Sequence, residues 1–358
     1  MGRVSKIAFY LVILPATWIF VGWQGWSWWS WVSSAPMDSD NLGESTEEND
    51  TAVQITIPPG TSSQQIGRDL EAAGLIRSSN AWRLWSRWLV FADPEGEYKA
   101  GTYQLSPTQP LSEVADKIWK GEVMQLSFTI PEGWSIKQMA EYFEEQGYFS
   151  AQAFMDAASQ IPYDDYPWLP RSLPLLEGFL YPDTYQVVAE RITPDAVIRQ
   201  MLDRFQQVAL PVYQENSNKT NLSLNEWVAL ASIVEKEAVV ASERRIISGV
   251  FHNRLKQGMR LAADPTVEYA LGIRQTVDQP LTFKQVETPS PYNTYLNTGL
   301  PPTAIASPGV ASLEATLDPE PTEYLYFMAR YDGTHIFSRT AAEHQAAIAE
   351  VERQLSTQ

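Results

Sequence analysis

Two glutamates near the middle of the chain, Glu235 and Glu237, are the residues best suited to acid–base chemistry. They end the segment 223–238, which opens with a capping box formed by Ser223 and Glu226. On a helix the two glutamates fall on opposite flanks of one apolar stripe. Glu237 has the bulkier apolar neighbours, and an apolar surround raises a carboxyl pKa toward the range of a general acid. The pattern therefore favours Glu237 as a proton donor.

The same two glutamates cannot flank one scissile bond, because residues i and i+2 diverge by about 200° around a helix. A conventional glycosidase would need a second carboxylate from elsewhere, whereas in a lytic mechanism the sugar's own hydroxyl attacks. A structural interpretation is also open, in which both glutamates form salt bridges with Arg244 and Arg245. The candidates for a second carboxylate are Asp264, Glu268, Glu177 and Asp183.

Composition argues against several other kinds of active site. The 358 residues include no cysteine, which excludes disulfides, thiol nucleophiles and cysteine-based zinc sites. The three histidines disfavour a histidine-rich metal centre, and we interpret His252 as structural. A net charge of −17 argues against nucleic acid as the main partner, because its phosphates would meet a net anion. We expect neither a metal nor an organic cofactor, since acid–base chemistry needs none.

Helices are expected to position these residues from about residue 126 onward. Between 259 and 322 the chain is dense in Pro, Gly, Asn and Thr, and its aromatic residues argue against disorder there. A hairpin is predicted around Asp332 and Gly333. The apolar periodicity predicts helices at 135–146, 151–159, 193–208, 223–238, 241–257 and 340–354.

A repeated pattern occupies 57–62 and 130–135, where IPPGTS and IPEGWS begin two similar segments. Each copy predicts a strand, a Pro/Gly turn, a serine N-cap and a helix that a glycine ends. Between the copies, 101–105 reads as a strand and 111–120 as a helix, so a small α+β module is expected at 52–125. The repeat is either scaffold or a carbohydrate-binding module that resembles LysM.

The amino-terminal region predicts a membrane anchor. Residues 1–6 contain two basic residues, and 7–32 contain no charge and can span the ~30 Å of hydrocarbon. Tryptophans crowd the second half of this span, which suits a membrane–water boundary. The positive-inside rule then places 1–6 in the cytoplasm, and the acidic residues of 33–51 predict a disordered tether. A cleaved signal peptide is the alternative, but no small-x-small site closes the apolar run.

Several longer strings stand in a specific order along the chain. The strings are LEGFLYPDTY at 176–185, ASIVEKE at 231–237, VFHNRL at 250–255, GMRL at 258–261, DPTV at 264–267, YNTY at 292–295, GLPP at 299–302, ASPG at 306–309 and YLYF at 324–327. With them, the chain resembles the YceG-like family over about residues 52–354. The resemblance implies an α+β fold with a single-pass transmembrane helix, a LysM-like subdomain at 52–125 and a mainly helical catalytic domain at 126–358 with short strands and long Pro/Gly-rich loops. The family's catalytic glutamate matches Glu237.

The resemblance implies a lytic transglycosylase of the inner membrane with its catalytic domain on the periplasmic side. Such an enzyme cleaves the β-1,4 bond between N-acetylmuramic acid and N-acetylglucosamine in nascent glycan strands and leaves a 1,6-anhydro end. Glycan strands, the membrane and peptidoglycan synthases are the expected partners. His335 is either a substrate contact or a turn residue. Substrate contacts are expected from Glu235, Asn253, Asp264, Thr266, Tyr292, Asn293, Tyr295, Glu177 and His335.

Three other functions remain open at this point. A muramidase-type hydrolase on the same fold would use Asp264 or Glu268 to position water and would produce reducing ends. A non-catalytic wall-binding division or elongation factor would bind glycan and tolerate loss of Glu237. A structural tether would depend only on the anchor and the repeat.

Overall fold

A computed structural model describes the fold, which is of the α+β class as expected, with helices and three two-stranded sheets among the described residues. The chain divides into two units. The first comprises 1–126 with 188–191, and the second comprises 127–187 with 192–358. The described residues are 14–37, 52–189, 192–276, 279–330 and 332–355.

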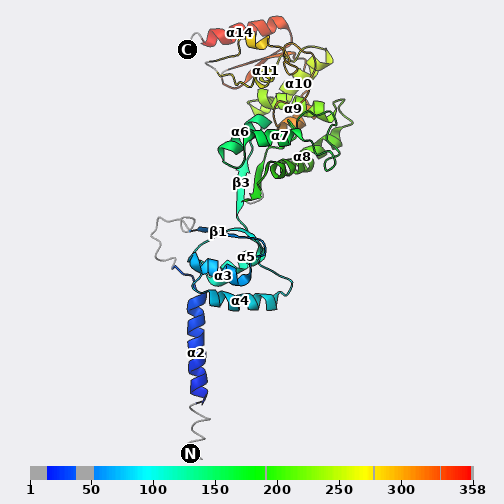
Figure 1. The fold of residues 1–358 in the computed structure, drawn as a ribbon. Helices are drawn as coiled ribbons and strands as arrows, with labels where there is room; N and C mark the ends of the chain where they lie inside the picture. Colours follow the sequence, from blue (N-terminus) through cyan, green and yellow to red (C-terminus); the bar gives the residue numbers. More distant parts are fainter. Residues whose placement is uncertain (1–13, 38–51, 190–191, 277–278, 331, 356–358) are drawn as a thin grey trace, which may run out of the picture. The chain divides into compact units, whose positions relative to one another are not determined.

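The first unit combines a long helix with a small α+β module (Figure 1). The strands β1 and β2 are antiparallel, with Val53 opposite Leu105 and Ile57 opposite Gly101. The predicted strand 101–105 and helix 111–120 are confirmed, whereas α4 is an additional helix. The elements are α2 (Leu14–Ser33), β1 (Val53–Ile57), α3 (Ser63–Ala72), α4 (Ser79–Ala92), β2 (Gly101–Leu105) and α5 (Leu111–Lys120).

The long helix α2 ends against this module. Val32 is buried in the module's core, and the ring of Trp29 stacks on Trp85 with 6.2 Å between centroids. Among the described residues, no helix combines the length and apolarity needed to cross a bilayer. The predicted cytoplasmic end 1–6, the first part of the predicted span 7–32 and most of the predicted tether 33–51 lie outside the described residues.

The second unit is mainly helical. The six predicted helices are confirmed, although the one at 193–208 continues to Asn216 and the one at 241–257 begins as a 3₁₀ turn. The predicted hairpin is also present, as an antiparallel pair. The elements are β3 (Gln125–Thr129), α6 (Ile136–Glu145), α7 (Ala151–Ser159), β4 (Thr184–Val188), α8 (Pro194–Asn216), α9 (Leu224–Glu237), the 3₁₀ helix Ala241–Glu243, α10 (Arg244–Lys256), α11 (Asp264–Leu271), α12 (Phe283–Val286), α13 (Val310–Leu317), β5 (Tyr326–Ala329), β6 (His335–Ser338) and α14 (Ala341–Leu355).

The two copies of the repeat have the same local structure, as predicted. Ser62 and Ser135 each accept a hydrogen bond from the backbone N–H three residues later, which caps the helices α3 and α6. Gly74 and Gly147 follow the helices with φ near +72° and +74°. In each copy the next residue donates its N–H to a carbonyl of the last helical turn, which completes a Schellman motif.

The helix α9 lies at the centre of the second unit, in contact with α10, α11 and α13. Residues 227–234 are all buried. One side of α9, including Trp227 and Val228, belongs to the larger core, and the other side, including Leu230 and Ile233, belongs to a smaller core. The residues of the predicted apolar stripe are buried, but residues 228, 229, 232 and 233 on the other faces are buried too, because tertiary contacts surround this part of the helix.

Candidate active site

Glu237 is the last residue of α9 and is half-buried. Within the described part of the chain, its carboxyl group forms no hydrogen bond or ion pair. The pKa of Glu237 is raised to about 8, mainly by burial and in addition by the charges of Asp264 and Glu268, whereas the charge of Arg254 lowers it. The negative end of the helix dipole acts in the same direction as burial. Glu237 is therefore protonated at neutral pH, as a general acid must be.

Asp264, one of the predicted candidates for a second catalytic carboxylate, is the first residue of α11. The hydroxyl of Tyr295 donates to its Oδ1 at 2.6 Å, and the amide of Gln275 donates to its Oδ2 at 3.2 Å. Burial and the neighbouring Asp264 raise the pKa of Tyr295 above its usual range. Asp264 and Tyr295, both predicted site residues, are thus joined to each other and electrostatically coupled to Glu237.

Arg254 on α10 is the buried cation of this cluster, and burial lowers its pKa. Its Nε donates to the carbonyl of Leu325 and its Nη1 to that of Leu261, both at 2.6 Å. Its guanidinium also lies over the ring of Tyr326, 5.2 Å from the centroid. Arg254 therefore holds the backbone that leads into α11 and partly offsets the negative charge around Glu237.

The backbone that leads into Asp264 takes an unusual conformation at Ala262, the one non-glycine residue of the described chain with a positive φ (46°). Such a conformation costs about 1–3 kcal/mol. The N–H of Ala262 bonds to the carbonyl of Thr294, and the N–H of Ala263 bonds to the Thr294 hydroxyl. Thr266, a predicted substrate contact, is fully buried and shares a 2.9 Å hydrogen bond with the same hydroxyl. Thr266 and Thr294 therefore hold this turn in place.

A second buried carboxyl, Glu177, accepts the N–H of Ile136 at 3.0 Å and the hydroxyl of Tyr269 at 3.0 Å. Burial raises the pKa of Glu177 to about 7, and both hydrogen bonds oppose that change. The ring of Tyr269 lies 4.8 Å from that of Tyr292, whose hydroxyl bonds to Thr303. Glu177 therefore joins the start of α6 to the pair formed by Tyr269 and Tyr292, of which Tyr292 is a predicted substrate contact.

A cavity of about 460 Å³ lies beside these groups. Its lining includes Lys236, which precedes Glu237 in the chain, and Glu268, whose charge acts on Glu237, but it does not include Glu237 itself. Both signs of charge border it, which suits a ligand with several polar groups. The charged and aromatic residues of its lining are Lys137, Glu177, Lys236, Glu268, Tyr269 and Arg274.

The salt-bridge interpretation of the two glutamates is wrong. Arg245 pairs with Asp318 at 2.7 Å, and neither glutamate forms an ion pair with a described residue. Glu235 instead accepts the N–H of Gly309 at 3.1 Å, just before α13. Its carboxylate is therefore engaged in holding a loop.

Two more predicted contacts, Asn253 and Asn293, donate their side-chain amides to backbone carbonyls at 2.8–3.0 Å. These bonds hold neighbouring loops, and a contact with sugar remains a prediction for both residues. Asp183, a candidate second carboxylate, pairs with Arg204 at 2.6 Å. His252 bonds through Nε2 to the carbonyl of Thr316, in agreement with a structural role.

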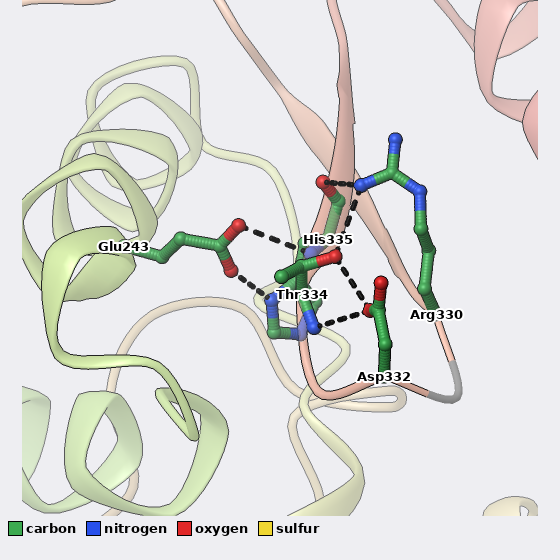
Figure 2. A network of polar contacts seen from close by, with 5 residues as sticks. All are labelled: Glu243, Arg330, Asp332, Thr334 and His335. Carbon is green, nitrogen blue, oxygen red and sulfur yellow. Dashed lines mark hydrogen bonds and ion pairs between the residues drawn. The ribbon is translucent and has the colours of Figure 1, made fainter.

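His335 belongs to a separate polar network on the β5–β6 hairpin (Figure 2). Its Nδ1 lies 2.7 Å from Oε2 of Glu243, and its backbone N–H bonds to Oε1 of the same residue. Asp332 accepts from Thr334, and Arg330 bonds to the Thr334 hydroxyl. His335 thereby attaches the hairpin to the start of α10, and a direct contact with substrate remains a prediction.

Sequence reasoning did not single out Arg254 or Tyr269. A signal for Arg254 was present, because it stands one helical turn after Val250 and Phe251 and so shares their buried face. Tyr269 carries no such signal, since its partner Glu177 lies far away in the chain.

The sequence profile of the YceG-like family matches residues 55–350. The protein of Bacillus subtilis strain 168 named endolytic murein transglycosylase is 30% identical over 316 residues, which cover 84% of this chain and 85% of that protein. A protein of the same name from Streptococcus pneumoniae D39 is 30% identical over 83% of this chain, a match that spans 58% of the pneumococcal protein. A crystal structure of a YceG-like protein from Listeria monocytogenes aligns with a TM-score of 0.57 and 33% identity, and covers 82% of this chain and 98% of that one. The chain therefore belongs to the YceG-like family.

Proposed function

We propose that this protein is an endolytic peptidoglycan lytic transglycosylase, anchored in the membrane, with Glu237 as its acid and base. The observation that carries the proposal is a half-buried glutamate at the end of α9 whose carboxyl group has a pKa of about 8 and no partner among the described residues. Relatives in Bacillus and Streptococcus named endolytic murein transglycosylase support the substrate class. The bond cleaved would be the β-1,4 bond from N-acetylmuramic acid to N-acetylglucosamine.

Glu237 would transfer protons in both halves of the reaction. Its carboxyl proton passes to the glycosidic oxygen as the bond to the muramoyl anomeric carbon breaks. The resulting carboxylate then takes the proton of the muramoyl 6-hydroxyl as that oxygen attacks the anomeric carbon. The products are a 1,6-anhydromuramoyl end and a strand with a free 4-hydroxyl, and Glu237 regains its proton.

The acids around Glu237 suit the charge that develops in this reaction. Glycoside cleavage passes through a cationic, oxocarbenium-like transition state. Asp264 and Glu268 are coupled to Glu237 electrostatically, so their negative charge would stabilise that cation. Tyr295, Tyr292 and the loops of 259–309 would exclude water from the anomeric carbon.

The proposed location is the inner membrane, with the catalytic unit on the periplasmic or extracytoplasmic side. The uncharged span 7–32, the basic residues before it and the acidic residues after it support this orientation. Cleavage of nascent strands beside the membrane would terminate glycan polymerisation and would bring the enzyme into contact with peptidoglycan synthases.

A muramidase-type hydrolase is the second candidate, and Asp264 favours it. A carboxylate coupled to the catalytic acid is what a hydrolase uses to activate water or to attack the sugar. The two functions differ in their products, because hydrolysis leaves a reducing end where the lytic reaction leaves an anhydro end.

The test is mass spectrometry of the products from purified glycan strands. The full chain in detergent is compared with Glu237→Gln and with the matched control Glu235→Gln, in which the amide oxygen still accepts the loop N–H. Anhydro ends from the parent and the control, with none from Glu237→Gln, would support the proposal. Reducing ends would replace the lytic reaction with hydrolysis, and cleavage by Glu237→Gln would exclude this residue as the acid.

A further inference from the structure

The helix α4 has two apolar faces, of which the module's core uses one. Its inner face buries Trp82, Ser86 and Leu89. Its opposite face, here called the outer face, consists of Leu84, Trp88 and Phe91 together with Arg83 and Arg87. Leu84 is 44% exposed, Trp88 53% and Phe91 84%. A surface helix is expected to be polar on the side away from its core, so the outer face is suited to a partner.

The charges of α4 indicate what that partner is. Arg83 and Arg87 are its charged residues, and no acid occurs in Ser79–Ala92 although the whole chain carries −17. Trp, Leu and Phe beside arginines on one helix face are typical of helices that lie in the bilayer interface. The arginine stems can cover apolar surface while their guanidinium groups reach anionic lipid phosphates.

The outer face is continuous with the aromatic end of α2. Trp29 of α2 stacks on Trp85, and Trp85 lies 4.9 Å from Trp88 on the outer face. Arg77 lies over the ring of Trp31 and donates to the carbonyl of Ala35, which fixes the end of α2 on the module. In Figure 1, α4 extends sideways from this end of α2.

We propose that the outer face of α4 lies in the headgroup region of an anionic phospholipid bilayer. A helix that extends sideways from the end of a membrane-inserted helix can lie along the bilayer surface, with its tryptophan at the boundary that indoles prefer. The proposal rests on the anchoring part of the proposed function and is independent of the cleavage chemistry. Its consequence is that α4 fixes the orientation of the first unit on the membrane.

The absence of cysteine from the chain permits a direct test with single nitroxide labels. Phe91→Cys reports on the outer face, Trp23→Cys on α2, and Glu71→Cys on an exposed, charged position of α3. Each labelled full chain is reconstituted into vesicles of phosphatidylcholine and phosphatidylglycerol. Collision of the label with oxygen, which concentrates in lipid, is compared with collision with a nickel chelate, which stays in water.

The expected result is that oxygen collisions dominate at positions 91 and 23 and that nickel collisions dominate at position 71. Lipid contact at 23 with water contact at 91 would overturn the proposal for α4 and leave the anchor intact. Water contact at both 23 and 91 would overturn the anchor and the proposal together. A label at 91 shielded from both reagents would identify a protein partner or a second copy of the chain, and would equally overturn it.

The two arginines provide a matched variant. Arg83→Glu with Arg87→Glu, in the Phe91→Cys background, should shift the label toward water in vesicles that contain phosphatidylglycerol. The shift should shrink in vesicles of phosphatidylcholine alone, because the attraction to anionic lipid is then absent. An unchanged label position in both kinds of vesicle would overturn the role of the arginines.

Discussion

Replacement of Glu237 by glutamine should change how the stability of the second unit depends on pH. The folded protein raises the pKa of Glu237 from 4.5 to about 8, so the fold binds this proton more tightly than the unfolded chain does. The stabilisation is fully present below about pH 4.5 and is lost as the pH rises through about 8. Glutamine has almost the same shape and no proton to lose, so the variant should escape this loss.

The size of the effect follows from the pKa change. Each pKa unit corresponds to about 1.4 kcal/mol, so a rise from 4.5 to about 8 corresponds to at most about 5 kcal/mol at high pH. Glu237 is half-buried and not fully enclosed, and solvent screening reduces the cost of its charge. We therefore expect Glu237→Gln to be more stable than the parent by about 2–3 kcal/mol near pH 9.

The assay is urea unfolding of the full chain and of the variant at a series of pH values. Glu177, whose pKa is also raised by burial, contributes equally to both proteins and cancels in the difference. Glu145→Gln is the matched control, because it makes the same change at an exposed position on α6. A constant difference between parent and Glu237→Gln from pH 4.5 to above pH 8 would refute the argument that the fold holds this carboxyl neutral.

Three further substitutions test the surroundings of the site. Asp264→Asn removes a charge that raises the pKa of Glu237, so the rate of cleavage should fall off on the alkaline side at a pH up to about 1 unit lower than in the parent. A pH–rate profile identical to the parent's would contradict the coupling between the two acids. Ser232→Ala leaves the N–H of Ile305 without its buried acceptor and should cost about 1–3 kcal/mol in urea unfolding, whereas no loss would mean that the backbone finds another partner. Gly178→Ala places a Cβ 2.4 Å from a neighbouring Cβ at a φ of +85° and should cost at least about 2 kcal/mol by the same assay; near-parental stability would show that the two segments separate easily.

The parts of the fold that local sequence governs could be predicted. The serine caps and terminal glycines of the repeat involve groups within a few residues of one another, and both copies form as expected. The apolar period also located the longer helices of the second unit, although the 14-residue helix α4 of the first unit was not predicted. The segment 259–322 was harder, because its helices α11, α12 and α13 have only 8, 4 and 8 residues and their apolar periods are too short to recognise. Start signals were nevertheless visible for α11, as a proline after Asp264, and for α12, as a capping box from Thr282 to Gln285.

The candidate site was predictable at its centre and less so around it. The role of Glu237 could be predicted from its apolar neighbours and from the family strings, because both kinds of signal lie within a single helix. The link from Tyr269 to Glu177 and the charges that Arg254 balances depend on which distant segments the fold brings together. No local pattern encodes these contacts. For the same reason, the polar groups of Thr266 and Asn293 could be assigned to a loop's own backbone only once that loop's path was known.

The repeat also shows how one local unit serves two purposes. Both turns place a glycine at positive φ, +79° for Gly60 and +76° for Gly133. Apart from its two chain neighbours, no described residue lies within 4 Å of a Cβ added at Gly60, whereas one added at Gly133 would meet the side chains of Glu235 and Lys236 at 3.7 Å. The Gly133 carbonyl accepts the Lys236 ammonium at 3.3 Å, and its N–H bonds to the carbonyl of Ser307.

These contacts assign a different interpretation, scaffold or carbohydrate binding, to each copy of the repeat. The second turn is bound to the last turn of α9, so it supports the helix end that carries Glu237 and is scaffold in that sense. The first turn is open, so of the two it is the one with room for a sugar chain. If the first module binds glycan, substitutions around Gly60 should weaken strand binding and leave the chemistry of Glu237 intact, whereas substitutions around Gly133 should impair the chemistry through α9.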